Sequence, residues 1–344
     1  MRGIYWLVAA GTLIGGGGWL MTQGDAGAAA HERDELAFPT HQRANDLERE
    51  TVRRTLAPLD TAAAAKDAVT HDPLLVALPP DADTALVFEA GTILRAPVGQ
   101  AMLACVSAED RAHMERSVID PSKSWLDLAD RVAFASSPAG ELVAVQGKLD
   151  AIDITKLAPD AVVHTYGTSA KVYDVAADDA RPELHVGVWS GSLVLTSHTR
   201  GLVLAALDRL DSGGSAKLAF DEREAYGEIY GVIGQADLER LAPPELRERV
   251  HDVAAHAEVH VDAIEEVLLV MDVEGSDAKQ VEDLGKSLGA ALAVGRLEAK
   301  REGEDALVRL MDQSRVRLYG DRRLRAEVAV PTDIMTRSMR GCGK

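Results

Sequence analysis

The chain has 344 residues, of which 47% are hydrophobic and only 4% aromatic, and its formal net charge is −18. This length and hydrophobic content suffice for two ordinary domains with packed cores, and they exclude a wholly disordered chain. The acidic balance repels phosphate backbones, so nucleic acid is not expected as a partner.

An uncharged apolar run covers residues 4–21, and the side chain of Arg2 is the one positive charge before it. A run of about 18 residues is just long enough to span a bilayer as a helix. Acidic residues follow it, so the charge asymmetry places Arg2 in the cytoplasm and the rest of the chain outside. We therefore expect residues 1–22 to be a signal anchor, which makes the membrane a partner and places the body in the periplasm. The alternative is a signal peptide that is cleaved near Ala30, where three alanines match the cleavage pattern. Cleavage there would release a secreted protein.

The stretch after this segment, residues 23–78, is expected to be a tether. Glycine, alanine and charged residues dominate it, and Pro39 and Pro58 interrupt any long helix. A pair of prolines ends the stretch and opens the folded body. The predicted divisions of that body are a first domain at residues 79–211, a second at 216–335 and a tail at 336–344.

Alternating apolar residues and turn signals predict the elements of the first domain. The expected strands are residues 84–89, 131–136, 141–149, 162–166, 171–175, 184–189 and 193–197. The expected helices are residues 92–106, 107–119 and 199–210. A Ser-Gly-Gly-Ser linker at 212–215 then closes the domain.

The second domain repeats this order of elements. Its expected strands are residues 228–233, 257–263, 267–273, 315–319 and 324–330. Its expected helices are residues 236–253, 277–297 and 303–311. Two prolines break the first of them, and Ser276 is the expected cap of the second. Each half is read as strand, helices, hairpin, helix, hairpin. The predicted fold class is therefore α+β, with two similar units of antiparallel β-hairpins packed with helices, as an internal duplication would produce.

His256 and His260 are weak candidates for metal ligands. On a helix these residues would share one face and could bind zinc, whereas on a strand they would lie about 13 Å apart. Polar and apolar side chains alternate from His256 to Ala263, which is the period of a strand. We therefore expect a half-buried strand with a solvated polar face, and neither a metal nor another cofactor.

Two short motifs resemble nucleophile sites, but neither predicts a catalytic residue. Ser276 and Lys279 match S-x-x-K, although the companion motifs of penicillin-recognising enzymes do not follow. Ser197 and His198 are adjacent, so on a strand their side chains point to opposite faces. Both serines are better explained as the caps of the helices that follow them.

Four arginines share the outward face of the last predicted hairpin: Arg315, Arg317, Arg323 and Arg325. This basic patch on an acidic protein is a weak candidate for binding an anionic ligand or an acidic partner. The alternative is pairing across strands with acids such as Glu258, Asp262 or Glu327.

The chain contains two cysteines, Cys105 and Cys342, which are too few for a disulfide framework. One bridge between them is compatible with an oxidising compartment, and the sequence leaves open whether they pair.

These patterns predict a non-catalytic envelope protein that is tethered through residues 4–21. Its extracytoplasmic domain would bind a protein partner of the envelope or a ligand. The alternative is an exported hydrolase or metal-dependent enzyme, which a cleft gathering His256, His260 or His198 with carboxylates would favour. A third hypothesis is an assembly factor that dimerises through sheet edges.

Overall fold

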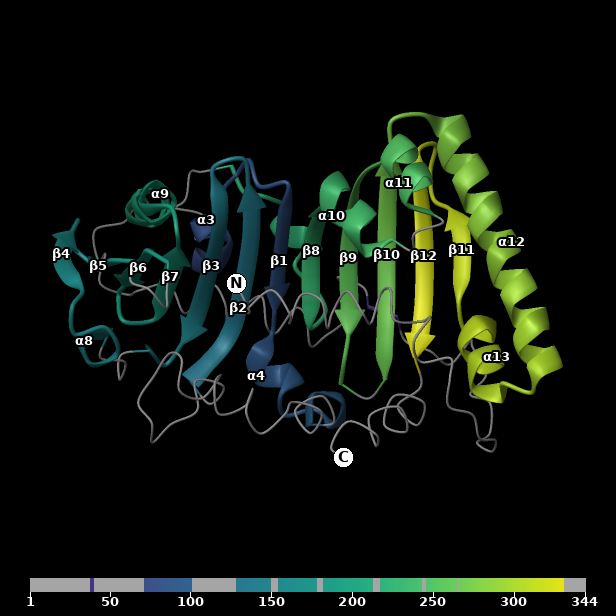
Figure 1. Ribbon diagram of the computed structural model, residues 1–344, viewed down its shortest axis with the longest axis horizontal. Helices are drawn as coiled ribbons and strands as arrows, with labels where there is room; N and C mark the ends of the chain where they lie inside the picture. Colours follow the sequence, from purple (N-terminus) through teal and green to yellow (C-terminus); the bar gives the residue numbers. More distant parts are fainter. Residues whose placement is uncertain are drawn as a thin grey trace. The chain divides into compact units, whose positions relative to one another are not determined.

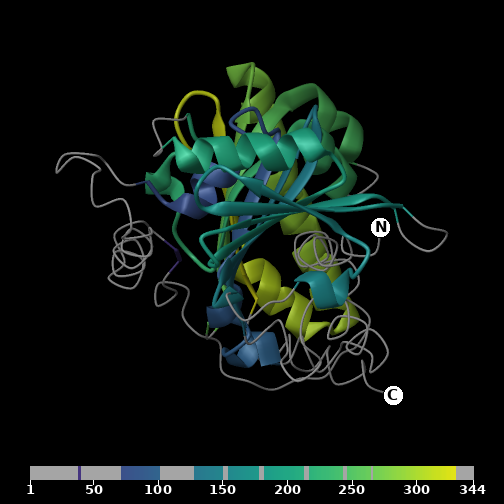
Figure 2. The ribbon, with the colours of Figure 1, turned by 90° about the vertical axis from the view of Figure 1, so that its left-hand side faces the viewer.

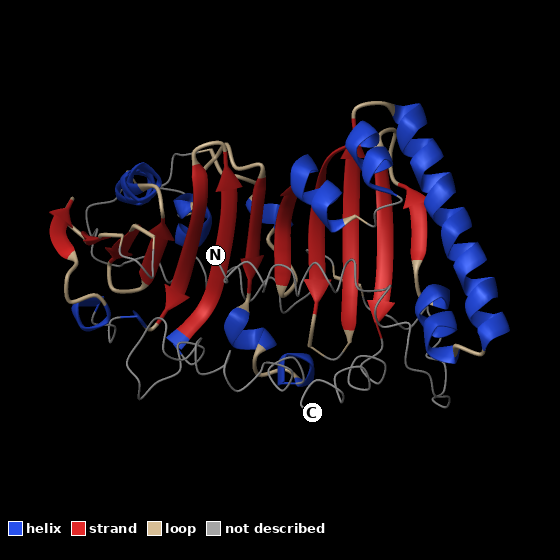
Figure 3. Ribbon diagram, viewed as in Figure 1, coloured by secondary structure: helices blue, strands red, loops and turns tan. Residues whose placement is uncertain are grey.

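The computed structural model describes residues 38–39, 71–100, 128–149, 154–177, 182–212, 217–242, 246–264 and 266–330. Helices and a large antiparallel β-sheet make up a mixed α and β fold (Figures 1 and 3). The chain divides into two compact units. We call residues 40–231 the N-terminal unit, and residues 232–344 with 38–39 the C-terminal unit. The division falls inside strand β8, Ile229–Gly234.

Several predictions concern residues outside the described ranges. They include the apolar run 4–21, the cleavage position at Ala30 and both cysteines. The predicted helix 107–119 and the tail 336–344 also lie there. Among the residues that the structure describes, no helix is both long enough and apolar enough to span a membrane.

In the described part of the N-terminal unit, seven strands follow the order β1-β2-β3-β7-β6-β5-β4, each antiparallel to its neighbours. Their bounds are β1 Thr84–Phe88, β2 Ala129–Ser137, β3 Gly140–Gly147, β4 Val162–Tyr166, β5 Ala170–Val175, β6 Leu184–Trp189 and β7 Leu193–Ser197. The helical segments are α3 Pro73–Ala77, α4 Ala90–Ile93, α8 Ile154–Leu157, α9 Arg200–Asp211 and the 3-10 turn η5 Glu222–Glu224. The predicted strands and the predicted helix 199–210 are confirmed to within a few residues.

Helix α9 covers one face of the strands β6 and β7 (Figure 2). Its buried side chains include Val203 and Leu207. Gly187 of β6 makes this close approach possible, because a Cβ atom there would lie 2.7 Å from Val203 Cγ1. The apolar stripe of α9 therefore packs closely on the sheet, because Gly187 of β6 has no side chain in the way.

The C-terminal unit contains β9 Ala254–Asp262, β10 Val267–Gly275, β11 Arg315–Leu318 and β12 Arg323–Val330 in the antiparallel order β11-β12-β10-β9. Its helices are α10 Gln235–Leu241, α11 Arg247–Val253, α12 Ala278–Glu302 and α13 Asp305–Asp312. Long helix α12 runs beside the edge strand β11 (Figures 1 and 3). The predicted hairpins and the break between α10 and α11 are confirmed.

Helix α12 shows how local chemistry sets its ends. Asp277 is its N-cap, and the Asp277 carboxylate accepts a hydrogen bond from Gln280 N at 2.9 Å. The predicted cap at Ser276 is therefore wrong by one residue, because the longer Asp277 side chain reaches the orphan N–H of the first turn. Gly303 ends the helix in the left-handed region at φ 77°.

Two predicted boundaries differ from the observed arrangement. The predicted tether extends to residue 78, whereas residues 72–78 are buried in the N-terminal unit. The predicted domain division lies at the linker 212–215, whereas the compact units divide between Gly231 and Val232. Residues 72–78 therefore belong to the folded N-terminal unit, although their composition resembles that of the predicted tether.

Candidate functional site

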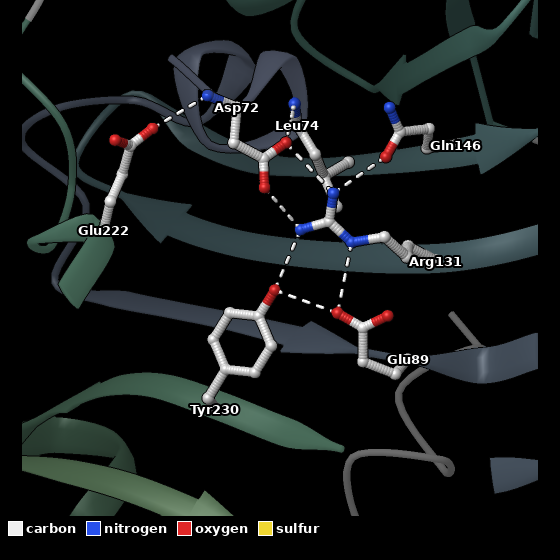
Figure 4. Close-up of polar contacts among 7 residues, drawn as sticks. All are labelled: Asp72, Leu74, Glu89, Arg131, Gln146, Glu222 and Tyr230. Carbon is white, nitrogen blue, oxygen red and sulfur yellow. Dashed lines mark hydrogen bonds and ion pairs between the residues drawn. The ribbon is translucent and has the colours of Figure 1, made fainter. Parts of the chain in front are cut away.

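The guanidinium of Arg131 on β2 contacts four polar side chains of the N-terminal unit (Figure 4). The residue is 3% exposed. Nη1 donates to Asp72 Oδ1 at 3.0 Å and to Gln146 Oε1 at 2.8 Å. Nη2 donates to Asp72 Oδ2 at 2.6 Å and to Tyr230 OH at 2.8 Å. Nε lies 3.3 Å from Glu89 Oε1 without a hydrogen-bond geometry, so this contact is an ion pair only.

The partners of Arg131 come from separate elements, which the guanidinium ties together. Asp72 is the N-cap of α3, Glu89 follows β1, Gln146 lies on β3 and Tyr230 lies on β8. Tyr230 OH also donates to Glu89 Oε1 at 3.2 Å. Gln146 and Tyr230 are buried, as are both carboxylates. We call this set of five residues the arginine centre.

Two opposing effects act on the charge of Arg131. Burial disfavours the cation, but the charges of Asp72, Tyr230 and Glu89 outweigh burial and raise the pKa of Arg131 well above its usual value. The guanidinium therefore stays charged, as its bidentate pairing with Asp72 requires. Breaking such a buried pair by removing one partner costs about 3–5 kcal/mol.

A second arginine fixes the other end of helix α3. Arg209, on α9, donates from Nε to Val76 O at 3.0 Å and from Nη2 to Ala77 O at 2.7 Å. Burial lowers the pKa of Arg209. These carbonyls belong to the last turn of α3, where helix carbonyls lack partners within the helix and a cation is favoured.

Helix α3 is thus held at both ends. At its start, the Asp72 carboxylate accepts from Leu74 N at 3.0 Å while it binds Arg131. Glu222 of η5 adds a third contact, because its Oε1 accepts from Asp72 N at 2.8 Å. All five residues of α3 are buried. We call the contacts of Arg131 and Arg209 with residues 72–77 the α3 clamp.

The contacts of the α3 clamp hold the fold together, and they offer no group for catalysis. Each nitrogen of the Arg131 guanidinium faces a partner, and Arg131, Asp72, Gln146 and Tyr230 are buried together. Charge-assisted hydrogen bonds of this kind are short and strong when desolvated. The arrangement therefore fixes the point at which the described chain enters the N-terminal unit.

The predicted basic patch forms a ladder of ion pairs in the C-terminal unit. Arg325 binds Asp272 through Nε at 2.7 Å and Nη2 at 2.5 Å, and its guanidinium lies 4.1 Å from the centre of the Tyr319 ring. Arg323 pairs with Glu274 on the neighbouring strand, at 2.9 Å.

The remaining two arginines of the patch differ from one another. Arg317 pairs with Glu327, whereas Arg315 is exposed and lies opposite Glu327 in the register of β11 and β12. Arg323 is also 3.7 Å from Glu258, one of the acids named from the sequence. This geometry is the one that the cross-strand alternative expects, and binding of an anionic partner stays a prediction.

His256 and His260 lie on β9, as the alternating pattern predicts. The expectation of a solvated polar face is wrong at the C-terminal end of β9, since His260 is 1% exposed and Asp262 is also buried. In register, His256 faces Glu274 and His260 faces Val270 on β10. In the described ranges, no group of three His, Cys, Asp or Glu residues could hold a metal ion.

The adjacent pair Ser197 and His198 is engaged by its own surroundings. Ser197 Oγ donates to Glu141 O at 2.6 Å and accepts from Thr199 N at 3.0 Å, at the start of α9. A ring nitrogen of His198 bonds the carbonyl oxygen of Glu183. Ser197 thus supports the turn into the helix, close to the expected cap role, although Thr199 is the N-cap residue.

A cluster that the sequence did not indicate surrounds Asp174 on β5. Its carboxylate lies 2.7 Å from His185 Nδ1, 3.1 Å from Arg200 Nε and 3.3 Å from His164 Nε2. Partial burial acts to raise the pKa of Asp174, but the hydrogen bonds from His185 and Arg200 outweigh it and lower that pKa. The carboxylate therefore links β4, β5, β6 and α9.

Replacing Asp174 with asparagine should lower the free energy of unfolding at neutral pH. A carboxylate with a depressed pKa contributes stability that is present above its unfolded pKa, about 3.8, and lost as pH falls through the folded value. The difference between wild type and Asp174→Asn should therefore shrink below pH 3.8. Urea unfolding across this pH range measures it, with Asp130→Asn, an exposed carboxylate of the same unit, as control. Equal shifts for both variants would contradict the assignment.

Comparison with known proteins gives only remote likeness. The sequence matches no known protein family and no curated protein. Among solved structures, crystal forms I, III and IV of TP0453 are similar, at 11%, 12% and 13% identity and TM-scores of 0.45, 0.48 and 0.48. The likeness covers 81%, 78% and 82% of this chain and 100%, 97% and 98% of theirs. At these identities and scores, it carries no inference about function.

Proposed function

We propose that this protein is a non-catalytic envelope protein. Residues 4–21 would hold it in the membrane, and its extracytoplasmic body would bind a protein partner or a ligand. The observation that carries the proposal is the α3 clamp, which binds residues 72–77, the last part of the predicted tether, to the N-terminal unit. Helix α3 begins at Pro73, and its two ends are fixed by the buried Arg131 and the half-buried Arg209.

The clamp suits a body that is held by its N-terminal end. A pull that reaches the N-terminal unit through His71 acts first on Asp72, whose carboxylate is bound to Arg131 on β2. Strand β2 is paired on both sides, by β1 and β3, so the load spreads into the sheet. Charge-assisted pairs that are shielded from water resist such a load better than exposed ones.

The net charge of the chain limits the classes of partner that its body is expected to bind. A net charge of −18 disfavours nucleic acid and anionic headgroups, so we place the membrane contact in residues 4–21 alone. The exported-hydrolase alternative needs a cleft that gathers histidines with carboxylates. His198 bonds the backbone carbonyl of Glu183, and no group of three His, Cys, Asp or Glu residues in the described ranges could hold a metal ion. The described residues therefore give that alternative no specific support.

The proposal includes the duplication expected from the sequence. Strand β1 is followed by α4 and later by the hairpin β2–β3, and strand β8 is followed by α10, α11 and the hairpin β9–β10. This common order supports two similar units of hairpins packed with helices. A superposition that failed to align β1, β2 and β3 with β8, β9 and β10 in an experimental structure would contradict it.

Alkaline washing of membranes from cells that express the tagged full chain tests the anchor. Leu13→Arg places a charge at the centre of the apolar run, where it costs about 2.5–3.5 kcal/mol of insertion free energy. We expect the wild type to stay in the membrane pellet and Leu13→Arg to lose much of that retention. Thr22→Arg, just beyond the run, is the matched control and should be retained. A wild-type protein found in the soluble fraction, with its mature terminus at His31, would overturn the tethered proposal.

A further inference from the structure

Among the described strands of the N-terminal unit, the outermost one is an open edge. Strand β4 stands last in the strand order, and within the described ranges it pairs with β5 alone (Figures 1 and 3). Four of its five residues are exposed, and Val162 and Val163 are 58% and 45% exposed. Such an edge presents a row of backbone N–H and C=O groups that another strand can pair with.

The edge strand of the C-terminal unit shows, by contrast, how an edge is protected. Strand β11 carries Arg315 and Arg317, and α12 packs against it. Charged side chains and a covering helix are the usual guards of a sheet edge. Strand β4 reads Val-Val-His-Thr-Tyr and contains no lysine, arginine, acid or proline. Two of its polar side chains contact partners in their own unit, because His164 lies 3.3 Å from Asp174 Oδ2 and Tyr166 OH donates to Asp208.

We propose that the occupant of this edge is β4 of a second copy of the chain, paired antiparallel about a two-fold axis. Such an axis at His164 brings each Val163 opposite Thr165 of the second copy, and each Val162 opposite Tyr166. Pairs of β-branched residues with each other or with aromatic residues are favourable across antiparallel strands. A two-fold interface uses the same patch on both copies, and this strand complements itself.

Charge also favours pairing of β4 with itself over pairing with a charged foreign strand. The strand contains no lysine, arginine or acid. The two-fold axis places His164 opposite His164 of the second copy, and each of these rings lies 3.3 Å from the Asp174 carboxylate of its own chain. The net charge of −18 opposes close approach of two copies, but salt screens exposed charges beyond about 8 Å at physiological ionic strength. We therefore infer a local, edge-to-edge contact between the bodies.

A single pair of five-residue strands is small beside the roughly 1,200–2,000 Å² that stable interfaces bury. The dimer is therefore weak in dilute solution and forms where copies are concentrated. This step rests on the proposed function, because a shared membrane raises the effective concentration of tethered bodies. The partner that the body binds, in this account, includes another copy of itself.

Site-specific photo-cross-linking of the full chain in its own membrane tests the proposal. A benzophenone side chain at Thr165 is expected to give an adduct of twice the chain mass, and the same probe at Leu318 on β11 is not. Adding Val163→Lys to the Thr165 probe should abolish most of that adduct, because two ammonium groups then flank the two-fold axis. Leu318→Lys is the matched control, since Leu318 is 48% exposed and Val163 is 45% exposed. Thermal unfolding of both lysine variants checks that they fold.

The outcomes separate this inference from the proposed function. An adduct with a different protein at Thr165, or no adduct in the membrane and a strict monomer by sedimentation at high protein concentration, would overturn the second copy as the occupant. A protein that washes off the membrane, yet forms the Thr165 adduct at high concentration in solution, would support the edge pairing while the tethered proposal fails.

Discussion

Replacing Arg131 with methionine is expected to lower the free energy of unfolding of the N-terminal unit by about 3–5 kcal/mol. The variant keeps an apolar side chain of similar length but leaves the carboxylates of Asp72 and Glu89 buried without the cation that balances them. It also removes donors from Gln146 and Tyr230. Urea unfolding of the full chain in detergent, followed by circular dichroism, measures the change.

Two further variants show whether the loss comes from the uncompensated charge. Arg223→Met removes an exposed arginine of the same unit and should change stability by no more than about 0.5 kcal/mol. Combining Arg131→Met with Asp72→Asn and Glu89→Gln neutralises the stranded carboxylates, and we expect it to recover part of the loss. If Arg131→Met were as stable as wild type, the arginine centre would not hold the unit together.

The second large effect is expected at the other arm of the α3 clamp. Arg209→Ala leaves Val76 O and Ala77 O without their cationic donor, and hydrogen bonds to charged groups contribute about 1.5–3 kcal/mol each. We expect a loss of about 3 kcal/mol, concentrated at α3. Hydrogen exchange of the amides of residues 74–77 should accelerate more than exchange in β2 or β3. Mass spectrometry of the matching peptides provides the measurement.

Arg209→Lys is the control for this variant. A lysine keeps the positive charge near the end of α3 but lacks the fork that reaches both carbonyls at once, so it should restore part of the protection. Unchanged exchange at α3 in Arg209→Ala would contradict the clamp. An equal acceleration across the whole unit would instead show that Arg209 stabilises the fold in general.

The hairpins were predictable because their signals are local. Alternating side chains and glycine turns place β4, β6 and β7 at the predicted residues, and Gly320 occupies the predicted turn with φ 79°. The pattern of β9 was equally clear, yet the burial of His260 was missed. Alternation predicts two faces of a strand but does not tell which parts of a face become covered.

The arginine centre could not be predicted in the same way, because its contacts are distant in sequence. Arg131 is 59 residues from Asp72 and 99 from Tyr230. Two local signals were nevertheless present. An arginine stands beside the apolar run of β2, and Asp72 before Pro73 is a typical helix start. Either one suggests a buried polar contact or a cap, but only the folded sheet brings them together.

Trypsin treatment of spheroplasts that express the full chain tests whether the body lies outside the cytoplasm and is tethered ahead of the α3 clamp. Arginines and a lysine at residues 33, 43, 49, 53, 54 and 66 offer cleavage positions in the predicted tether. We expect trypsin to release a folded fragment whose new terminus lies between residues 34 and 67, while a peptide containing residues 4–21 stays with the membrane. Protection of the whole chain until the membrane is permeabilised would place the body inside and contradict the account.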